Sequence, residues 1–541
     1  MEVDLVHVLA VVTIIGWFYH WLTKNLDYFH DKPIPSMAVK PIVGSTGSML
    51  FKKTSFTEFI KRAYDKFEGV KVFGLFDANL PFFVIRDPEL IKTIGIKDFE
   101  YFINHRPIFG KNDSDHPDVI FAKSLFVLND QKWKNMRITL SPAFTGSKMR
   151  QMFELIVDCC ESTASFYRDE CKSTKLPLVY EMKDVFSRFG NDVIASCAFG
   201  MKIDSFRNRE NQFFCHGKDM FKFNTVKAML RTFGFRFIPT IMSYLGIDFI
   251  EHKHNAYFSA LIKNAVNLRE TQGIFRPDMV HLLMQARKGT LKHQHEKFQK
   301  EGFATVEESD MGKGDTLHSM TEVEMIAQCL IFFLAGFDTV STNLTFLSYE
   351  LTINPDVQKK LYEEIVATHR SLKGSPLNYD TLQKMQYMDM VVCESLRMWP
   401  PVPAVDRLCV RNYELDDGAG LKFTIEKGTA VFFPVQGLHY DPKYFPNPEK
   451  FVPERFSDEN NENIRLGTYL PFGIGPRNCI ASRFALMEVK AIMYHMLLHF
   501  SFERTEKTQV PLQLAKGYIG LHSKAGLFVE LKPRSHVTVG E

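Results

Sequence analysis

The sequence predicts a mainly α-helical body with a small β-rich part, preceded by one apolar helix at the N-terminus. The apolar run from Leu5 to Leu22 approaches the roughly 20 residues that a membrane-spanning helix needs. Helical periodicity dominates residues 130–285, and a second long apolar helix follows a capping box that begins at Thr321. Short β-branched runs occur in residues 44–98, where they alternate with amphipathic helix.

Composition and charge exclude several other classes of protein. The chain has 541 residues, of which 45% are apolar and 24% charged, so collagen, coiled coil and wholesale disorder are excluded. With 66 basic and 63 acidic residues the net charge is +3, too near balance to indicate a nucleic-acid partner. The 9 cysteines are odd in number and include no CxxC pair, so a secreted disulfide framework and a zinc ribbon are not expected.

Residues 1–24 are predicted to form a membrane anchor. Trp17, Tyr19 and Trp21 cluster at the C-terminal end of the apolar run, where amphipathic rings favour the membrane interface. Acidic residues precede the run and lysines follow it, which places the body on the cytosolic side. A cleavable signal peptide is the alternative, but the run lacks a basic n-region and a small-residue cleavage site.

The segment after the anchor predicts a linker, assigned to residues 25–45, with a single domain over residues 46–541. Three prolines fall between Lys32 and Pro41, and proline stiffens an extended chain. Residues 287–320 are polar and lack an apolar period, so an exposed loop is expected there.

Helix boundaries are well marked in the second half of the chain. The helix that begins at the Thr321 capping box is expected to end near Ile353, before Asn354-Pro355. Another helix should end at Met398, before Trp399-Pro400, and the last should run from Ser482 to Phe500. Residues 429–435 (TAVFFPV) predict a short strand.

One cysteine lies in a segment that points to chemistry, Pro471 to Ala481 (PFGIGPRNCIA). Two glycines, at 473 and 475, permit a tight loop and a close approach of the backbone to a flat partner. Cys479 precedes a predicted helix, whose N-terminal amides favour the thiolate. A single thiolate suits a metal that is held mainly by another group, such as haem iron, whereas an ordinary structural glycine loop is the alternative.

The segment resembles the haem-binding loop of cytochrome P450 enzymes, Phe-x-x-Gly-x-Arg-x-Cys-x-Gly. The matching positions are Phe472, Gly475, Arg477 and Cys479, while Ala481 replaces the final glycine. The resemblance implies haem b as cofactor, with Cys479 as the axial ligand of its iron and Phe472 and Gly473 in the binding loop.

Two further motifs match the family. Trp133 and Arg137 fit Trp-x-x-x-Arg, and the resemblance implies that they bind a haem propionate together with Arg407 and Arg477. Glu394-Ser-Leu-Arg397 fits Glu-x-x-Arg, and with Arg455 it implies a structural triad on the haem side of the core. For the four-residue string alone, a surface ion pair is the alternative.

A third match lies in the long helix, at Ala335-Gly-Phe-Asp-Thr339. It resembles the oxygen-activating segment of the family, which implies that Asp338 and Thr339 are catalytic residues in proton delivery. Gly336 is expected to weaken the helix and permit local opening. The alternative is a helix glycine beside a threonine that bonds back to the helix.

The resemblance covers the chain from about Lys32 to beyond residue 500 and implies the cytochrome P450 fold. The segments FFLAGFDTVS and CIASRFA are most similar to those of insect microsomal cytochromes P450 of family nine, which metabolise xenobiotics and plant compounds. It implies an endoplasmic reticulum monooxygenase that takes electrons from NADPH through NADPH–cytochrome P450 reductase, with cytochrome b5 as a possible second donor. The lipophilic substrate would contact residues 105–126, residues 215–245, Phe337 and Pro403–Val405.

Two other function classes stay open at this point. A haem-thiolate isomerase or dehydratase needs no external electrons, but it has no use for the pair Asp338 and Thr339. A non-catalytic haem sensor would not need this pair either, and it would consume no NADPH.

Overall fold

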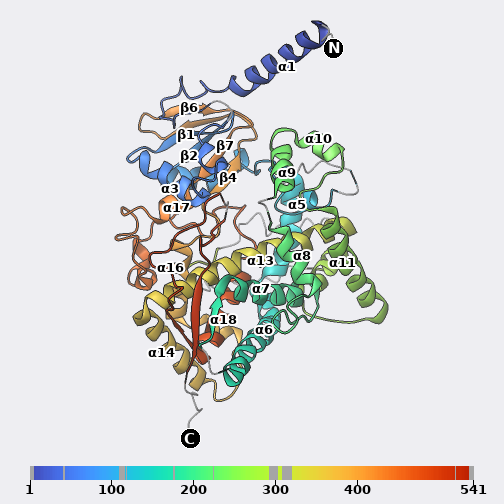
Figure 1. The fold of residues 1–541 in the computed structure, drawn as a ribbon, viewed down its shortest axis with the longest axis vertical. Helices are drawn as coiled ribbons and strands as arrows, with labels where there is room; N and C mark the ends of the chain where they lie inside the picture. Colours follow the sequence, from blue (N-terminus) through green and yellow to red (C-terminus); the bar gives the residue numbers. More distant parts are fainter. Residues whose placement is uncertain are drawn as a thin grey trace.

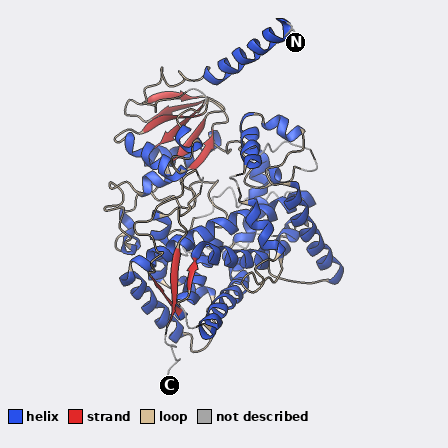
Figure 2. Cartoon of the chain, viewed as in Figure 1, coloured by secondary structure: helices blue, strands red, loops and turns tan. Residues whose placement is uncertain are grey.

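The computed structural model describes residues 5–40, 43–108, 116, 119–174, 177–222, 225–291, 302–306, 320–517 and 520–534. It has a helix-rich body and, at one end, a small lobe that contains most of the strands (Figure 1). A second, smaller group of strands lies among the helices near the C-terminus (Figure 2). The expected mainly helical architecture with a small β-rich lobe is therefore observed.

The described helices include the long helix after the Thr321 capping box and several helices within residues 130–285, where periodicity predicts them. Their bounds are α1 (Leu5–Thr23), α2 (Gly47–Leu50), α3 (Phe56–Lys66), α4 (Pro88–Lys92), α5 (Asp130–Leu140), α6 (Gly146–Ser173), α7 (Met182–Phe199), α8 (Gln212–Met220), α9 (Val226–Phe237), α10 (Pro239–Tyr244), α11 (His252–Gln272), α12 (Met279–Arg287), α13 (Glu322–Ile353), α14 (Pro355–Ser371), α15 (Tyr379–Gln383), α16 (Gln386–Met398), α17 (Val435–His439) and α18 (Ser482–His499). The expected ends of α13, α16 and α18 are confirmed to within one residue.

The strands form three small sheets. They are β1 (Val72–Asp77), β2 (Leu80–Ile85), β3 (Val179–Glu181), β4 (Val405–Leu408), β5 (Tyr413–Asp416), β6 (Lys422–Ile425), β7 (Ala430–Phe433), β8 (Phe500–Glu503) and β9 (Phe528–Pro533). The largest sheet has the order β1-β2-β7-β4, with β2 and β7 parallel and the other two pairings antiparallel. Because β2 and β7 lie more than 300 residues apart, this sheet joins the start of the chain to its last third.

The long helix α13 runs through the middle of the helical body. The capping box at its start is formed, since Thr321 Oγ1 accepts from the Glu324 backbone N–H and the Glu324 carboxylate accepts from that of Thr321. A Cβ placed on Gly336 would lie 2.4 Å from Ile194 Cδ1 of α7. The helix is continuous through Gly336, so the expected local opening is not observed, and this glycine instead lets α7 approach closely.

The predicted linker is packed against the β-rich lobe. Phe29 and Ile34 are buried, and the Met37 backbone N–H donates to the Gly74 carbonyl of β1 at 3.0 Å. Lys32 forms an ion pair with Glu426 at 2.8 Å. These contacts fix the path of the chain after α1, while the assignment of residues 25–45 as a linker remains a prediction.

The prediction of an exposed loop over residues 287–320 is wrong for the described part around residue 303. Phe303 contacts the rings of Phe456 and Tyr469, and Ala304 is buried. The Phe303 backbone N–H donates to the Asp389 carboxylate at 2.9 Å, which ties this segment to α16. Residues 292–301 and 307–319 lie outside the described residues.

Among the described helices, α13 alone is long and apolar enough to cross a membrane, and half of that stretch is buried inside the protein, so α13 is a core helix. The apolar stretch of α1, His7–Trp21, is shorter. Helix α1 projects away from the body beside the β-rich lobe (Figure 1), and it has exposed large apolar side chains, among them Ile14, Trp17 and Tyr19. The membrane anchor therefore remains a prediction.

Candidate functional site

The Cys479 loop is a closed turn that ends at the first residues of α18. The Cys479 backbone N–H donates to the Phe472 carbonyl at 2.9 Å, and that of Asn478 donates to the Gly475 carbonyl at 2.9 Å. Gly475 has a φ of +72°, and a Cβ there would lie 1.7 Å from the Gly95 carbonyl oxygen, so only glycine fits. Phe472 is partly buried at the edge of the helical core, and Gly473 has a φ of +76°. These two residues therefore shape the turn.

Cys479 is surrounded by many protein atoms, and yet its side chain keeps accessible surface. The Cys479 side chain is exposed although the flanking residues Arg477 and Asn478 are buried. On α13, Ala335 is likewise exposed in the middle of a largely buried helix. Side chains that are accessible although their neighbours are buried, as Cys479 and Ala335 are, are suited to contact with a bound cofactor.

The helix terminus does not by itself produce the expected thiolate. Burial raises the pKa of the Cys479 thiol, although the Ala481 backbone N–H and the Arg137 guanidinium act in the opposite direction. A metal cation bound to the sulfur would remove its proton. Ala481 has φ −100° and ψ 21°, which an L-residue adopts without strain, so this position does not require the glycine of the family pattern.

The residues expected to bind a negatively charged edge of the cofactor do come together. Trp133 and Arg137 are both buried on α5, one helical turn apart. The Arg477 guanidinium lies over the Trp133 ring, 4.4 Å from its centroid. Arg137 donates to the Asn478 carbonyl and side-chain oxygens at 2.9 and 2.8 Å. Asn478, which the sequence reasoning missed, thus joins α5 to the Cys479 loop.

Two buried arginines of this group have only neutral hydrogen-bond acceptors among the described residues. Arg477 donates to the backbone carbonyls of Ile103, Phe126 and Leu128. Arg407 on β4 donates to the carbonyls of Asp406 and Ile474, and its Nε is buried without a partner. Burial lowers the pKa of Arg407 to about 10, against the pull of the nearby Asp406. Such a pair fits a cofactor that carries carboxylates.

The structure directs Asp338 and Thr339 to different partners. Thr339 Oγ1 donates to the Ala335 carbonyl at 2.5 Å. This is the bond back to the helix that the alternative to a catalytic threonine predicts. Asp338 forms an ion pair with Lys183 of α7 at 2.8 Å, and Lys183 Nζ also donates to Ser341 and Thr342 at 2.8 Å each. Burial would raise the pKa of Asp338, but the Lys183 ammonium outweighs it and holds this pKa below its usual range.

Lys183 was not found from the sequence. It lies in the first turn of α7, and a lysine near the start of a helix carries no local signal of such a contact. Only the packing of α7 against α13 brings its ammonium to Asp338.

The pair of Glu394 and Arg397 within the expected triad is buried, so the alternative of a surface ion pair is wrong. Glu394 and Arg397 have no exposed side-chain surface, and they are joined by two hydrogen bonds of 2.7 and 2.9 Å. Arg455 Nε lies 3.3 Å from Glu394 Oε1, which also accepts from the Val452 backbone N–H at 2.9 Å. The charge-assisted bonds hold α16 against the segment that contains Arg455.

A histidine that the sequence reasoning missed links this triad to the Cys479 loop. Arg397 Nη1 donates to the His439 carbonyl at 2.7 Å. Leu470, the residue before the loop, donates its backbone N–H to His439 Nε2 at 2.9 Å, so Nδ1 carries the hydrogen and donates to the Arg397 carbonyl at 3.0 Å. Burial lowers the pKa of His439 to about 3, which keeps the ring neutral.

Comparison with known proteins gives matches along almost the whole chain. The sequence model of the family "Cytochrome P450" matches residues 35–529. Cytochrome P450 9e2 of Blattella germanica is 42% identical over 527 residues, 95% of each chain. Probable cytochrome P450 9f2 of Drosophila melanogaster is 40% identical, over 96% of this chain and 97% of that one. Cytochrome P450 3A9 of Rattus norvegicus is 33% identical over 95% and 94%, respectively.

We predict that Glu394→Gln destabilises the protein by about 3–5 kcal/mol, because it leaves the buried Arg397 guanidinium without its counter-charge. Denaturant unfolding of the variant and the parent measures this difference. The matched control is Asp380→Asn, which removes an exposed pair with Arg150 (3.0 Å) and should cost about 0–1 kcal/mol. Equal losses in the two variants would contradict a structural role for the triad.

Proposed function

The chain belongs to the cytochrome P450 family and is a P450 monooxygenase, and we propose that it inserts one oxygen atom of O2 into a lipophilic small molecule. The second oxygen atom leaves as water, with two electrons from NADPH and two protons. We propose that NADPH–cytochrome P450 reductase delivers the electrons, with cytochrome b5 as a possible second donor. The relatives named cytochrome P450 9e2 and 9f2 support membership of the insect family nine.

The observation that carries the proposal is the accessible Cys479 sulfur beside buried cations with neutral partners. Haem b fits these residues: Cys479 would ligate the iron, and Arg407 and Arg477, with Trp133 and Arg137, would bind the propionates. Phe472 and Gly473 would line the face of the porphyrin on the cysteine side. Bound in this way, the group supplies an iron centre for oxygen activation, whose reactivity the thiolate tunes.

We propose that Thr339 and Asp338 deliver protons from α13. The Thr339 hydroxyl lies one turn from the exposed Ala335, and it can exchange its bond to the Ala335 carbonyl for one to a bound molecule. Asp338 is kept ionised by Lys183, so it can accept a proton from solvent and pass it inward. Lys183 is thus a positioning residue for Asp338.

We propose an endoplasmic reticulum location, with residues 1–24 as a single-pass anchor and the body in the cytosol. The apolar length of the N-terminal run and its exposed side chains support this arrangement. Lipophilic substrates would then reach the site from the membrane, past residues 215–245. Metabolism of xenobiotics and plant compounds is the role that we propose for the reaction.

We predict that Cys479→Ser abolishes the thiolate-type Soret band of the ferrous–CO complex, because a hydroxyl does not replace the thiolate as ligand. The absorption spectrum of the purified, reduced protein under CO measures this change. Cys171→Ser, which changes a partly buried cysteine on α6, is the control and should leave the band as in the parent. A band that persists in Cys479→Ser would remove Cys479 as the ligand.

We predict that Thr339→Ala keeps the Soret band but diverts electrons from product to hydrogen peroxide, because a hydroxyl is lost from the proton path. The ratio of product formed to NADPH consumed measures this coupling. Thr352→Ala removes the same type of back-bond (2.7 Å to the Ser348 carbonyl) far along α13, so its coupling should equal that of the parent. Equal coupling in all three proteins would contradict the role of Thr339 in proton delivery. If the parent consumed no NADPH at all, an isomerase or a sensor would be favoured.

We predict that Lys183→Met makes coupling depend on pH. Without Lys183, burial shifts the pKa of Asp338 upward, so the carboxylate becomes protonated at a higher pH in the variant than in the parent. As the pH is lowered, coupling should therefore begin to fall at a higher pH in the variant than in the parent. Lys183→Arg retains the charge and should restore the profile of the parent, whereas the same pH profile in Lys183→Met and the parent would contradict the role of Lys183.

A further inference from the structure

Residues 302–306, which lie between α12 and α13 in the sequence, pack next to the residues that precede the Cys479 loop. Phe303 contacts the ring of Phe456, with centroids 5.2 Å apart, and the ring of Tyr469, with centroids 5.6 Å apart. These two rings also contact each other, at 5.0 Å. Tyr469 lies two residues before the start of the loop. The three rings therefore form one cluster that ends beside the loop.

The carboxylate of Asp389 on α16 anchors residues 302–306. It accepts the Phe303 backbone N–H at 2.9 Å, and it forms a largely buried ion pair with Lys490 of α18 at 2.7 Å. Gly302 has a φ of +101°, and a Cβ there would lie 2.9 Å from Asp389 Cγ, so this close approach requires glycine. Ala304 is buried. Specific contacts thus hold these residues on α16.

Two further contacts lead from the ring cluster to the loop. The Tyr469 ring stacks on the His439 ring, with centroids 5.3 Å apart and an angle of 22° between the planes. His439 Nε2 in turn accepts the backbone N–H of Leu470, the residue before the loop, at 2.9 Å. Tyr469 Oη donates to the Cys393 carbonyl of α16 at 2.9 Å, which fixes the orientation of the ring. A continuous chain of contacts therefore runs from Phe303 to the loop.

We propose that residues 302–306 are a strap that holds Tyr469 and His439 and, through them, the Cys479 loop. Phe303 is then a positioning residue for the sulfur. This inference rests on the proposed role of Cys479 as the ligand of haem iron. The His439 ring has two supports, its hydrogen bond to the Arg397 carbonyl and its stacking on Tyr469, and the second depends on Phe303. Without the strap, the sulfur is held less firmly against the iron.

The test follows two signals of the full-length holoenzyme at one low concentration of denaturant. They are the thiolate-type Soret band of the ferrous–CO complex and the helix content by far-UV circular dichroism. Phe303→Ala should speed the loss of the band about tenfold, the factor expected from the loss of two aromatic contacts. The rate of helix loss should not change, because the buried pair of Glu394 and Arg397 remains. Phe303→Tyr keeps the ring and should restore the rate of the parent.

Gly302→Ala releases the strap by another route, since its Cβ pushes the backbone away from Asp389 while all three rings remain. It should speed the loss of the band as Phe303→Ala does. Gly289→Ala is the matched control, because Gly289 also lies between α12 and α13 and also has a positive φ (+66°), but nothing lies within 4 Å of its Cβ. It should lose the band at the rate of the parent.

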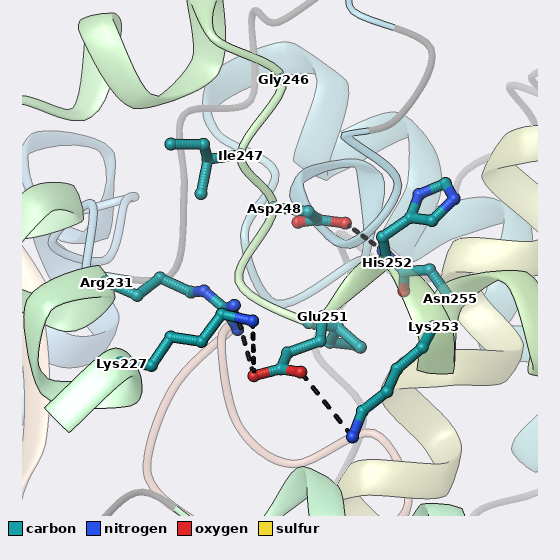
Figure 3. A pocket seen from close by; sticks show the side chains of 10 residues that line it. Lys227, Arg231, Gly246, Ile247, Asp248, Glu251, His252, Lys253 and Asn255 are labelled. Carbon is teal, nitrogen blue, oxygen red and sulfur yellow. Dashed lines mark hydrogen bonds and ion pairs between the residues drawn. The ribbon is translucent and has the colours of Figure 1, made fainter. Parts of the chain in front are cut away.

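A second control changes the protein away from the strap, in a pocket of about 460 Å³ between α9 and the start of α11 (Figure 3). There the nitrogens of Arg231, Lys227 and Lys253 lie 3.5, 3.6 and 3.9 Å from the oxygens of Glu251. Glu251→Gln leaves these cations without their shared counter-charge. Because α9 and α11 lie apart from α16 (Figure 1), any change should affect the band and the helices to the same extent.

The outcomes separate this proposal from the proposed function. Equal acceleration of band loss and helix loss in Phe303→Ala would make the role of Phe303 purely structural and would overturn the strap. A parent with the thiolate-type band whose Phe303→Ala variant loses it no faster would also contradict the strap alone. A parent without this band would contradict Cys479 as the ligand, and the role of the strap with it.

Discussion

The buried ion pair of Glu394 and Arg397 is the interaction on which the geometry of the site depends. Two charges without solvent contact are stable only if each is fully hydrogen-bonded. Here the bonds that satisfy them extend to Arg455, to the carbonyl of His439 and, through the His439 ring, to the residue before the Cys479 loop. The position of the sulfur is therefore fixed by α16, far from it in sequence, as well as by the glycines of its own loop.

Much of the fold could be predicted because its signals are local. The Thr321 capping box and the prolines after Ile353 and Met398 mark helix ends through backbone chemistry that depends on neighbouring residues alone. The sites of Cys479 and Glu394 could be located because their short motifs resemble those of the cytochrome P450 family. Their burial, however, is a tertiary property.

The remainder required the three-dimensional structure. Phe303 packs on Phe456 and Tyr469 from a polar stretch whose composition indicates solvent exposure. Lys183 and His439 act through partners more than 30 residues away, so no spacing rule identifies them. A glycine within a helix predicts a weak point at Gly336, whereas the close approach of Ile194 gives it a packing role that only the neighbouring helix reveals.

The contact between Trp21 and Phe237 has a consequence for how this protein is prepared. Membrane enzymes are commonly shortened at the N-terminus to obtain a soluble form, and a cut after residue 24 would remove the aromatic neighbour of α9 and the carbonyl acceptor of Asn79. Helix α9 would then lose a support that residues 1–24 provide. Crystals or kinetics of a shortened form would report on an α9 that is held less firmly than in the chain with residues 1–24.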